Sequence, residues 1–481
     1  MLSILFLIPF LSAIAIIFSS PARLTARVAG VSTLVIGLYA AFTWQCDCWS
    51  SSISVLRTPS LDLAFGFLNG TSSIMVALSV IVLAAAVFSG KAPEGREKLY
   101  YASSLLIAAG AIGAFISTNL FFFYAFHELA LIPTFLMIGL LGRGSRKEIA
   151  WKITVYLGVG SLILLAGLVW LARECGTYNM IEMLKQTQEI DHNTQKSIAA
   201  LLIIGFGTLV SLFPFHSWAA PAYASAPAPT AMLHAGVLKK FGLYGLLQLA
   251  VPLVPVGMNA WLTPLLVLLL GNILWVGFVT INQKRIDGML GHSSVMHMGY
   301  IFLAIAALIA SKHAGVENPY AIPAASVLMF AHGISIAMLF GLADRIERCT
   351  GTLDLADLGG LAKPAPRLAF LFGIAGMASL GLPGLANFSG EVMVFLSGFF
   401  GRSAGGALEP VQIATILSLW GVVMSAVYVL RVFRKTFQGP TVNSTVNATD
   451  IPLLEQLPAL LLAAALLVVG LYPNILVNLL H

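Results

Sequence analysis

The sequence predicts an all-α polytopic membrane protein with about 14 transmembrane helices. Its 481 residues are 58% hydrophobic and 10% charged, with a mean hydropathy of +0.92, whereas soluble domains carry about 25% charged residues. Apolar segments also recur at close to the roughly 20 residues that cross a bilayer. These observations exclude a soluble enzyme. The formal charge of +6 indicates no nucleic-acid partner, because the basic residues are spread over loops.

Apolar segments of spanning length follow one another along the whole chain, separated by short polar loops. Each is long enough to cross a bilayer as a helix. The predicted segments are residues 1–19, 28–44, 71–89, 98–116, 118–141, 152–173, 197–217, 226–250, 258–282, 289–311, 322–344, 366–404, 410–435 and 454–478.

The seventh and twelfth segments are irregular. Segment 366–404 is too long for one span and is broken at Gly381-Leu382-Pro383-Gly384, and segment 197–217 runs into Pro214 and an Ala/Pro-rich stretch. Irregular backbone at membrane depth survives only where it is buried in protein or lines a wet cavity. Interrupted segments at corresponding places in two halves of a chain indicate inverted repeats around a transport site.

The expected organisation follows from these two halves. The parts are 1–97 (three N-terminal helices), 98–250 (first half of a transporter core), 251–435 (second half), and 436–481 (a loop and the last helix).

Loop charge predicts the orientation. Of the 26 Lys and Arg residues, 18 fall in one set of alternate loops and 6 in the other. Because basic loops stay in the cytoplasm, we expect both termini on the outer side of the membrane.

Three charged residues interrupt apolar segments. Lys239 and Lys240 stand together near the middle of segment 226–250, and Glu128 lies near the middle of segment 118–141. A lysine at this depth costs about 2.5–3.5 kcal/mol on insertion scales, so such residues are functional candidates. The alternative interpretation of Glu128 is a structural role, in which its carboxylate pairs locally with His127.

Two histidines and a second acid extend this set. His297 and His332 lie in consecutive apolar segments, and Glu391 follows the Gly381–Gly384 break by seven residues. A lone histidine in an apolar helix usually packs with a hydrogen bond, but beside a buried lysine a pair can relay protons. Acids, lysines and histidines along one bundle suit proton movement better than a bulky substrate. The predicted pathway is Glu128, Lys240, His297, His332 and Glu391.

Other chemistry is not indicated. The sequence has no dinucleotide-binding, P-loop or nucleophile-elbow motif and no metal-ligand spacing. Cys46 and Cys48 are predicted to lie too close together for an ordinary mutual disulfide. A bridge from Cys175 to one of them stays open.

These motifs together resemble the antiporter-like membrane subunits of respiratory complex I, specifically the M chain of NADH:quinone oxidoreductase. The similarity runs from about residue 98 to residue 440. The segments that carry it are FPFHSW at 213–218, AGVLKKFGLYG at 235–245, QKRIDGMLGHSSVMHMGY at 283–300, AHGISIAMLF at 331–340, DLADLGGLAKPAP at 354–366, GLPGLANFSGEVM at 381–393 and VYVLRVFRKTFQGP at 427–440.

The resemblance implies 14 helices, two inverted five-helix repeats and proton transfer along a central polar axis. Glu128 and Lys240 correspond to the glutamate of helix 5 and the lysine of helix 8, His297 and His332 to relay histidines, and Glu391 to the terminal acid of helix 12. It implies a bacterial cytoplasmic membrane, L-like and N-like antiporter chains as partners, and no cofactor in this chain. NADH, flavin, iron–sulfur clusters and quinone are expected in partner subunits.

One departure from the family pattern concerns the seventh segment. The family carries a lysine seven residues before the histidine of the PFHSW motif, and that position is Leu209 here. We expect Lys239 to compensate by pairing with Glu128. Two alternatives remain: a cation/proton antiporter subunit of the Mrp or membrane-bound hydrogenase type, and a structural membrane-arm subunit with impaired pumping. Glu391 argues against the antiporter, because antiporter subunits usually place lysine there.

Overall fold

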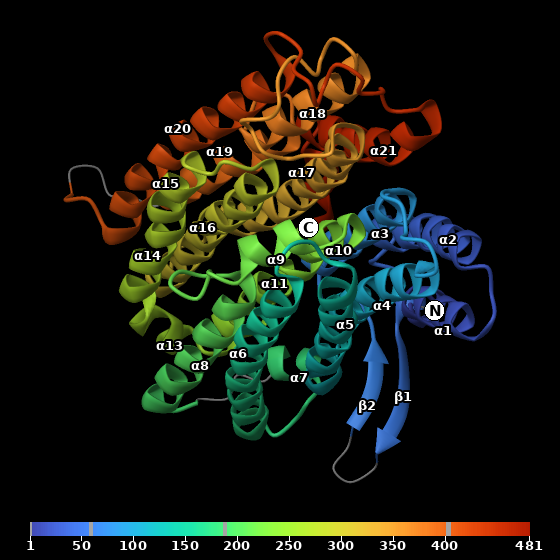
Figure 1. Cartoon of the computed structure of the whole chain (residues 1–481). Coiled ribbons are helices and arrows are strands. Elements are labelled where there is room, and N and C mark those ends of the chain that lie inside the picture. Colours follow the sequence, from blue (N-terminus) through green and yellow to red (C-terminus); the bar gives the residue numbers. More distant parts are fainter. Residues whose placement is uncertain (1, 57–60, 186–189, 401–405) are drawn as a thin grey trace.

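Helices make up most of the molecule. The computed structural model describes residues 2–56, 61–185, 190–400 and 406–481 (Figure 1). The helices are α1 (Ser3–Phe18), α2 (Ala22–Phe42), α3 (Gly70–Phe88), α4 (Glu97–Ile116), α5 (Leu120–Leu141), α6 (Arg146–Cys175), α7 (Met180–Lys185), α8 (His192–Val210), α9 (Ala219–Ser225), α10 (Ala228–Leu233), α11 (Lys240–Gly245), α12 (Val251–Leu253), α13 (Pro255–Ala260), α14 (Leu262–Leu270), α15 (Val276–Ile281), α16 (Ile286–His313), α17 (Ala321–Thr350), α18 (Pro366–Ser379), α19 (Ala386–Phe399), α20 (Pro410–Phe437), α21 (Leu453–Leu471) and α22 (Asn474–Val477).

Eleven helices in the described ranges are long and apolar enough to cross a membrane, counting α14 and α15 as one. The predicted spans outside this set are α1, the segment containing α10 to α12, and the pair α18 and α19, which are shorter or interrupted. The multi-pass helical fold is therefore confirmed, and the count of 14 stays a prediction. The fourfold division of the chain also stays a prediction.

The centre of the bundle is formed by α3, α16 and α17. About nine-tenths of the apolar windows of these helices is buried within the protein, against about two-fifths for α2 and α21. A helix that is apolar all round and buried all round belongs to the interior, whereas one with an exposed apolar face borders lipid. Side chains that α16 and α17 direct inward are thus shielded from both water and lipid.

The first interruption lies between α8 and α9. Helix α8 ends at Val210, seven residues before the predicted boundary, because Ser211 adopts a left-handed conformation (φ 66°). The Asn272 side chain accepts from the Phe213 N–H (2.7 Å) and donates to the Ser211 carbonyl (3.0 Å). A buried amide therefore satisfies backbone groups that the helix leaves free.

The second interruption lies between α18 and α19. Gly381 (φ 79°) and Gly384 (φ 90°) carry the chain through the break, in a conformation that favours glycine. Both predicted breaks are confirmed.

The segment after α10 is wound more widely than an α-helix. π-helical turns cover His234–Leu238 and Leu246–Ala250, on either side of α11, and a third covers Gly271–Trp275 between α14 and α15. Such turns are rare and often occur at functional sites. The first of them ends directly before the two buried lysines, so it sets the direction of both side chains.

A β-hairpin projects beyond the helices (Figure 1). Strands β1 (Ser51–Leu56) and β2 (Leu61–Phe65) pair antiparallel, with Ser51 opposite Phe65. This element departs from the all-α expectation. The polar–apolar alternation that produces it spans only five or six residues in each strand, too few to stand out beside the long apolar segments.

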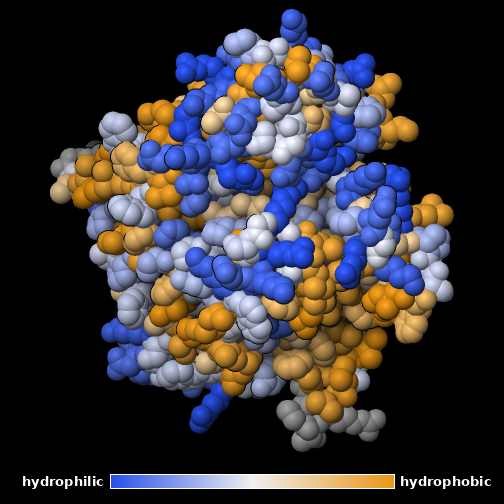
Figure 2. All heavy atoms as spheres, in the orientation of Figure 1, coloured by the Kyte–Doolittle hydropathy of each residue, from blue (hydrophilic) through white to orange (hydrophobic). Residues whose placement is uncertain are grey.

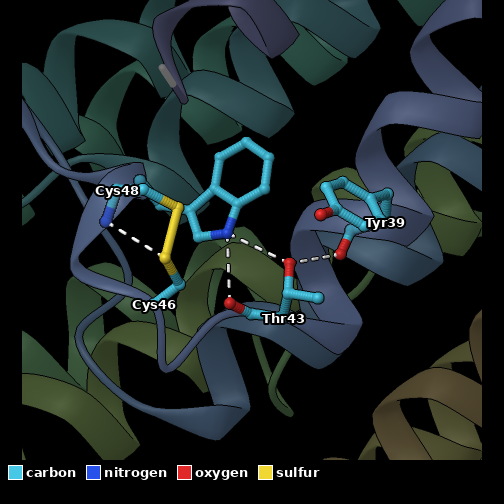
Figure 3. Close-up of a disulfide and its surroundings, with 5 residues drawn as sticks. Tyr39, Thr43, Cys46 and Cys48 are labelled. Carbon is cyan, nitrogen blue, oxygen red and sulfur yellow. Dashed lines mark hydrogen bonds between the residues drawn. A yellow bond between two sulfur atoms is a disulfide. The ribbon is translucent and has the colours of Figure 1, made fainter.

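The prediction about Cys46 and Cys48 was wrong, because the two form a disulfide (Figure 3). A 3₁₀ turn, Asp47–Trp49, brings their Cα atoms to 5.2 Å, within the usual range for a bridge. Trp49 Nε1 donates to the carbonyl and the hydroxyl of Thr43 (3.1 Å each), which anchors the turn to the end of α2. Cys175 is buried and unpaired.

Candidate functional site

Lys240 lies at the start of α11 and is fully buried. Its Nζ donates to the Ala235 carbonyl (2.7 Å) and lies 2.9 Å from His332 Nδ1. A buried amine without such partners is costly, so the widened turn and the histidine together stabilise it. Because an ammonium can only donate, His332 Nδ1 is the acceptor in that state and His332 Nε2 carries the ring hydrogen.

His332 on α17 faces His297 on α16, with their ring centroids 5.6 Å apart. His297 Nδ1 lies 2.8 Å from the Ser293 carbonyl, and its Nε2 lies 3.0 Å from the Ser379 carbonyl. Carbonyl oxygens only accept hydrogen bonds, so both contacts are satisfied at once only when His297 is an imidazolium. The protein therefore offers a place where a proton can rest on this ring.

Glu391 on α19 completes the buried group. Its side chain is 6% exposed, and Oε1 lies 4.0 Å from His297 Nε2. Gly381 makes room for it, since a Cβ at that position would stand 2.3 Å from Glu391 Oε2. Ser379, whose carbonyl contacts His297, ends α18. The second helix break thus holds both the terminal carboxylate and a carbonyl that orients the histidine.

Lys239 points in a different direction from Lys240. Its Nζ lies 3.3 Å from the Ser294 carbonyl and 5.6 Å from the centre of the Tyr223 ring. Tyr223 belongs to α9, so this lysine connects α16 to the first helix break.

Glu128 stands apart from the other predicted residues. Its side chain is 35% exposed, contacts His127 Nδ1 (3.3 Å), and accepts a short hydrogen bond from Ser161 of α6. It lines a cavity of about 260 Å³ between α5 and α6.

The expected pair of Glu128 with Lys239 is not formed. Over the described ranges, no ion pair within 4.0 Å joins them. The reason is geometric: Glu128 faces α6 on the outer side of α5, whereas the π-helical turn before Lys239 directs that lysine inward, toward α16. Leu209, the position of the missing lysine, is buried on α8.

Two contacts near these buried residues were not predicted from the sequence. His127 stacks on Phe241, the neighbour of Lys240, with ring centroids 4.1 Å apart. Tyr428 of α20 and Ser293 share a hydrogen bond of 2.8 Å. Polar side chains on the inner faces of apolar helices were the available signal, but helical spacing alone does not show which of them meet.

The geometry joins four of the predicted residues in one buried row: Lys240, His332, His297 and Glu391. An amine, two imidazoles and a carboxylate can each gain and lose a proton, and the two ends of the row lie at a π-helical turn and at a broken helix. Interrupted helices around buried titratable groups define a polytopic membrane protein of the transporter type.

The family model described as "NADH:quinone oxidoreductase/Mrp antiporter, TM" matches residues 117–408. The chain belongs to this family. F(420)H(2) dehydrogenase subunit M of Methanosarcina mazei is 28% identical over 98% of this chain and 94% of its own. NAD(P)H-quinone oxidoreductase chain 4 1 of Synechococcus sp. is 30% identical over 98% and 90%. A chain of respiratory complex I from Thermus thermophilus, solved with bound NADH, superimposes with a TM-score of 0.88 at 25% identity, covering 100% and 98%.

Proposed function

We propose that this chain is a proton-translocating membrane-arm subunit of an NADH:quinone oxidoreductase. The observation that carries the proposal is the buried row from Lys240 to Glu391, with contacts of 2.9 Å at one end and 4.0 Å at the other. The relatives are subunits of quinone-reducing or related dehydrogenase complexes by name.

The row supplies a sequence of proton positions. Lys240 and His332 share one hydrogen bond, through which a proton passes between the amine and Nδ1. His332 Nε2 has no hydrogen-bond partner within the described part of the chain, and a gap separates its ring from that of His297, with the ring centroids 5.6 Å apart. A single water molecule can bridge such a gap. From His297, the proton passes to Glu391, whose Oε1 is likewise buried and unpartnered there.

Redox chemistry belongs to partner subunits in this proposal. NADH, flavin, iron–sulfur clusters and quinone are assigned to those subunits, and the whole complex is proposed to act as a translocase. L-like and N-like antiporter chains are the proposed neighbours. Glu128 faces outward from α5, so it is placed to meet such a neighbour. The proposed location is a bacterial cytoplasmic membrane with both termini outside, which the loop charges of 18 against 6 support.

The test is Glu391→Gln in the intact complex, assayed in inverted membrane vesicles for NADH oxidation and proton uptake together. Glutamine keeps the shape and removes the exchangeable proton, so we expect coupled turnover to fall about a hundredfold, the lower end of the effect of losing a proton-transfer group, with assembly unchanged. Glu317→Gln, at an exposed position in the loop between α16 and α17, is the matched control. An assembled Glu391→Gln complex with unchanged rate and stoichiometry would overturn the proposal.

A further inference from the structure

A second cluster of charge lies far from the proton row, in a cavity of about 200 Å³ where the ends of α2, α3, α17 and α21 meet. Figure 2 shows hydrophilic residues gathered in this region, with hydrophobic residues on the flanks of the molecule. Five cationic side chains and one acidic one line the cavity: Arg23, Arg27, Lys91, Arg345, Arg348 and Glu455.

The acid does not balance the cations. Arg345 and Arg348 both reach Glu455, at 3.5 and 3.4 Å, and Arg348 also pairs with Asp344 at 2.9 Å. The other three cations, Arg23, Arg27 and Lys91, have no carboxylate within 4.0 Å among the residues that the structure describes. The cavity therefore keeps the positive charge of Arg23, Arg27 and Lys91, which no carboxylate of the described residues pairs.

Two guanidinium groups also leave donors free. The Nε atoms of Arg27 and Arg345 are buried, and neither has a hydrogen-bond partner in the described chain. Arg27 is held in place by Phe88, whose ring centre lies 4.8 Å from the guanidinium carbon, and Arg345 by the carbonyls of Thr449 and Asp450 (3.1 and 2.9 Å). Buried donors are almost always paired, so the two unpaired donors of residues that line this cavity point to an acceptor that the described chain does not supply.

Apolar side chains also line the cavity, and exposed apolar faces of two helices lie next to it. Phe88, Met232, Met338 and Leu462 line it. On either side, α2 exposes Leu24 (62%) and Val28, and α21 exposes Leu453 and Leu457. Hydrophobic faces of this kind contact the acyl chains of lipids, whereas they would contribute nothing to the binding of a free anion.

We propose that this cavity binds the phosphate headgroup of an anionic phospholipid, with its acyl chains lying along the exposed faces of α2 and α21. Basic pockets between transmembrane helices on the cytoplasmic side recognise such headgroups. The bound lipid bridges the N-terminal helices α2 and α3 to α17 and α21, which joins the two ends of the chain. This inference does not depend on the proton route, because it uses none of the residues of the row.

The experiment measures lipid binding to the purified complex in nanodiscs, using spin-labelled phosphatidylglycerol and phosphatidylcholine as probes. The test variant is Arg23→Gln with Lys91→Gln, both exposed in the structure, and the control is Lys147→Gln with Lys152→Gln, two exposed lysines of α6 outside the cavity. Since one basic residue near the surface contributes about a fivefold gain in affinity, we expect phosphatidylglycerol binding to fall about 25-fold in the test variant and less than about twofold in the control. Thermal unfolding in phosphatidylcholine nanodiscs checks that both variants are folded.

Two results would overturn the proposal. The first is an equal loss of phosphatidylglycerol binding in both variants, which identifies general surface charge rather than this cavity. The second is displacement of the labelled lipid by millimolar inorganic phosphate, which identifies a free-anion site. Strong preference for phosphatidylglycerol over phosphatidylcholine, lost only in the test variant, supports it.

Discussion

Lys240 and His332 depend on each other. The amine has two acceptors, the Ala235 carbonyl and His332 Nδ1, and no carboxylate lies within 4.0 Å of it in the described ranges. Its charge is therefore stabilised by neutral dipoles and not by an ion pair. Apolar packing around both residues keeps water from competing for the shared hydrogen bond.

The single variants Lys240→Met and His332→Leu test this dependence. Each removes one proton position from the same row, so we expect each to lower the proton-pumping rate by about a hundredfold. Residues that act as a unit are non-additive, so the double variant should pump little worse than either single one. Proton uptake in vesicles gives the measurement. If the fold-loss in pumping rate of the double variant equals the product of the two single losses, the two residues act in separate steps.

Leu209 raises the question of how Glu128 functions without the family lysine. Leu209 is buried on α8, next to Thr208, which packs against Gly160 of α6; the adjacent Ser161 donates to Glu128. A lysine introduced at position 209 thus starts on α8, the helix that packs against α6 next to the Ser161 donor of Glu128.

Leu209→Lys should therefore cost stability unless Glu128 pairs with the new amine. A lone lysine at this depth costs about 2.5–3.5 kcal/mol, so we expect Leu209→Lys to be clearly less stable when combined with Glu128→Gln. Thermal unfolding of the four forms gives the coupling energy. Leu202→Lys, two turns earlier on α8 and also buried, is the control and should show no coupling. Equal coupling at both positions would mean that Glu128 does not respond to a local cation.

At the scale of elements, the break between α18 and α19 is more than a gap between helices. It supplies the Ser379 carbonyl to His297 and the space beside Gly381 to Glu391. A continuous helix would bond that carbonyl internally and fill that space. The break between α18 and α19 thus determines where Glu391 and the His297 ring are placed.

Gly381→Ala tests this directly. The new Cβ would stand 2.3 Å from Glu391 Oε2 and must displace the carboxylate. We expect pumping to fall about tenfold, with an added strain of about 1–2 kcal/mol from the left-handed backbone. Gly384→Ala has the same backbone strain (φ 90°), but its Cβ would meet only Leu471 at 3.9 Å. It should lose stability and keep pumping. If both variants pump alike, the close approach of Gly381 is unimportant.

The helical spans and both breaks could be predicted from the sequence, because hydropathy reports burial and Gly381-Leu382-Pro383-Gly384 cannot continue a helix. The disulfide and the direction of Lys239 could not. Cys46 and Cys48 meet through a 3₁₀ turn, and Lys239 turns inward after a π-helical turn, so both depend on backbone hydrogen-bond registers that composition does not encode. The contact of His297 with Glu391 depends on how α16 packs against the break, which is likewise a tertiary property.

At the scale of the whole molecule, the orientation in the membrane can be tested by labelling. Lys147 lies at the start of α6 and Lys185 at the end of α7, on opposite sides of the span that α6 provides. Cysteines at these positions, in a background with Cys175 and Cys349 replaced by serine, should react with an impermeant maleimide from opposite faces, Lys147→Cys from the cytoplasm and Lys185→Cys from outside. Labelling of both positions from one face would contradict the helix order, and reversed labelling would contradict the orientation.

The three π-helical turns have a consequence for how relatives of this chain are compared. A π-helical turn holds one more residue than the α-helical turn that it replaces, and each residue of an α-helix advances the direction of its side chain by about 100°. A relative that has lost one residue from His234–Leu238 would keep the same apolar pattern, but its lysine side chains would point in a different direction around the helix axis. Single-residue gaps in this short interval therefore carry more functional information than many substitutions elsewhere. Relative to the chain before it, such a gap would bring Lys240 to the place of Lys239 and Phe241 to the place of Lys240, so no lysine would meet His332.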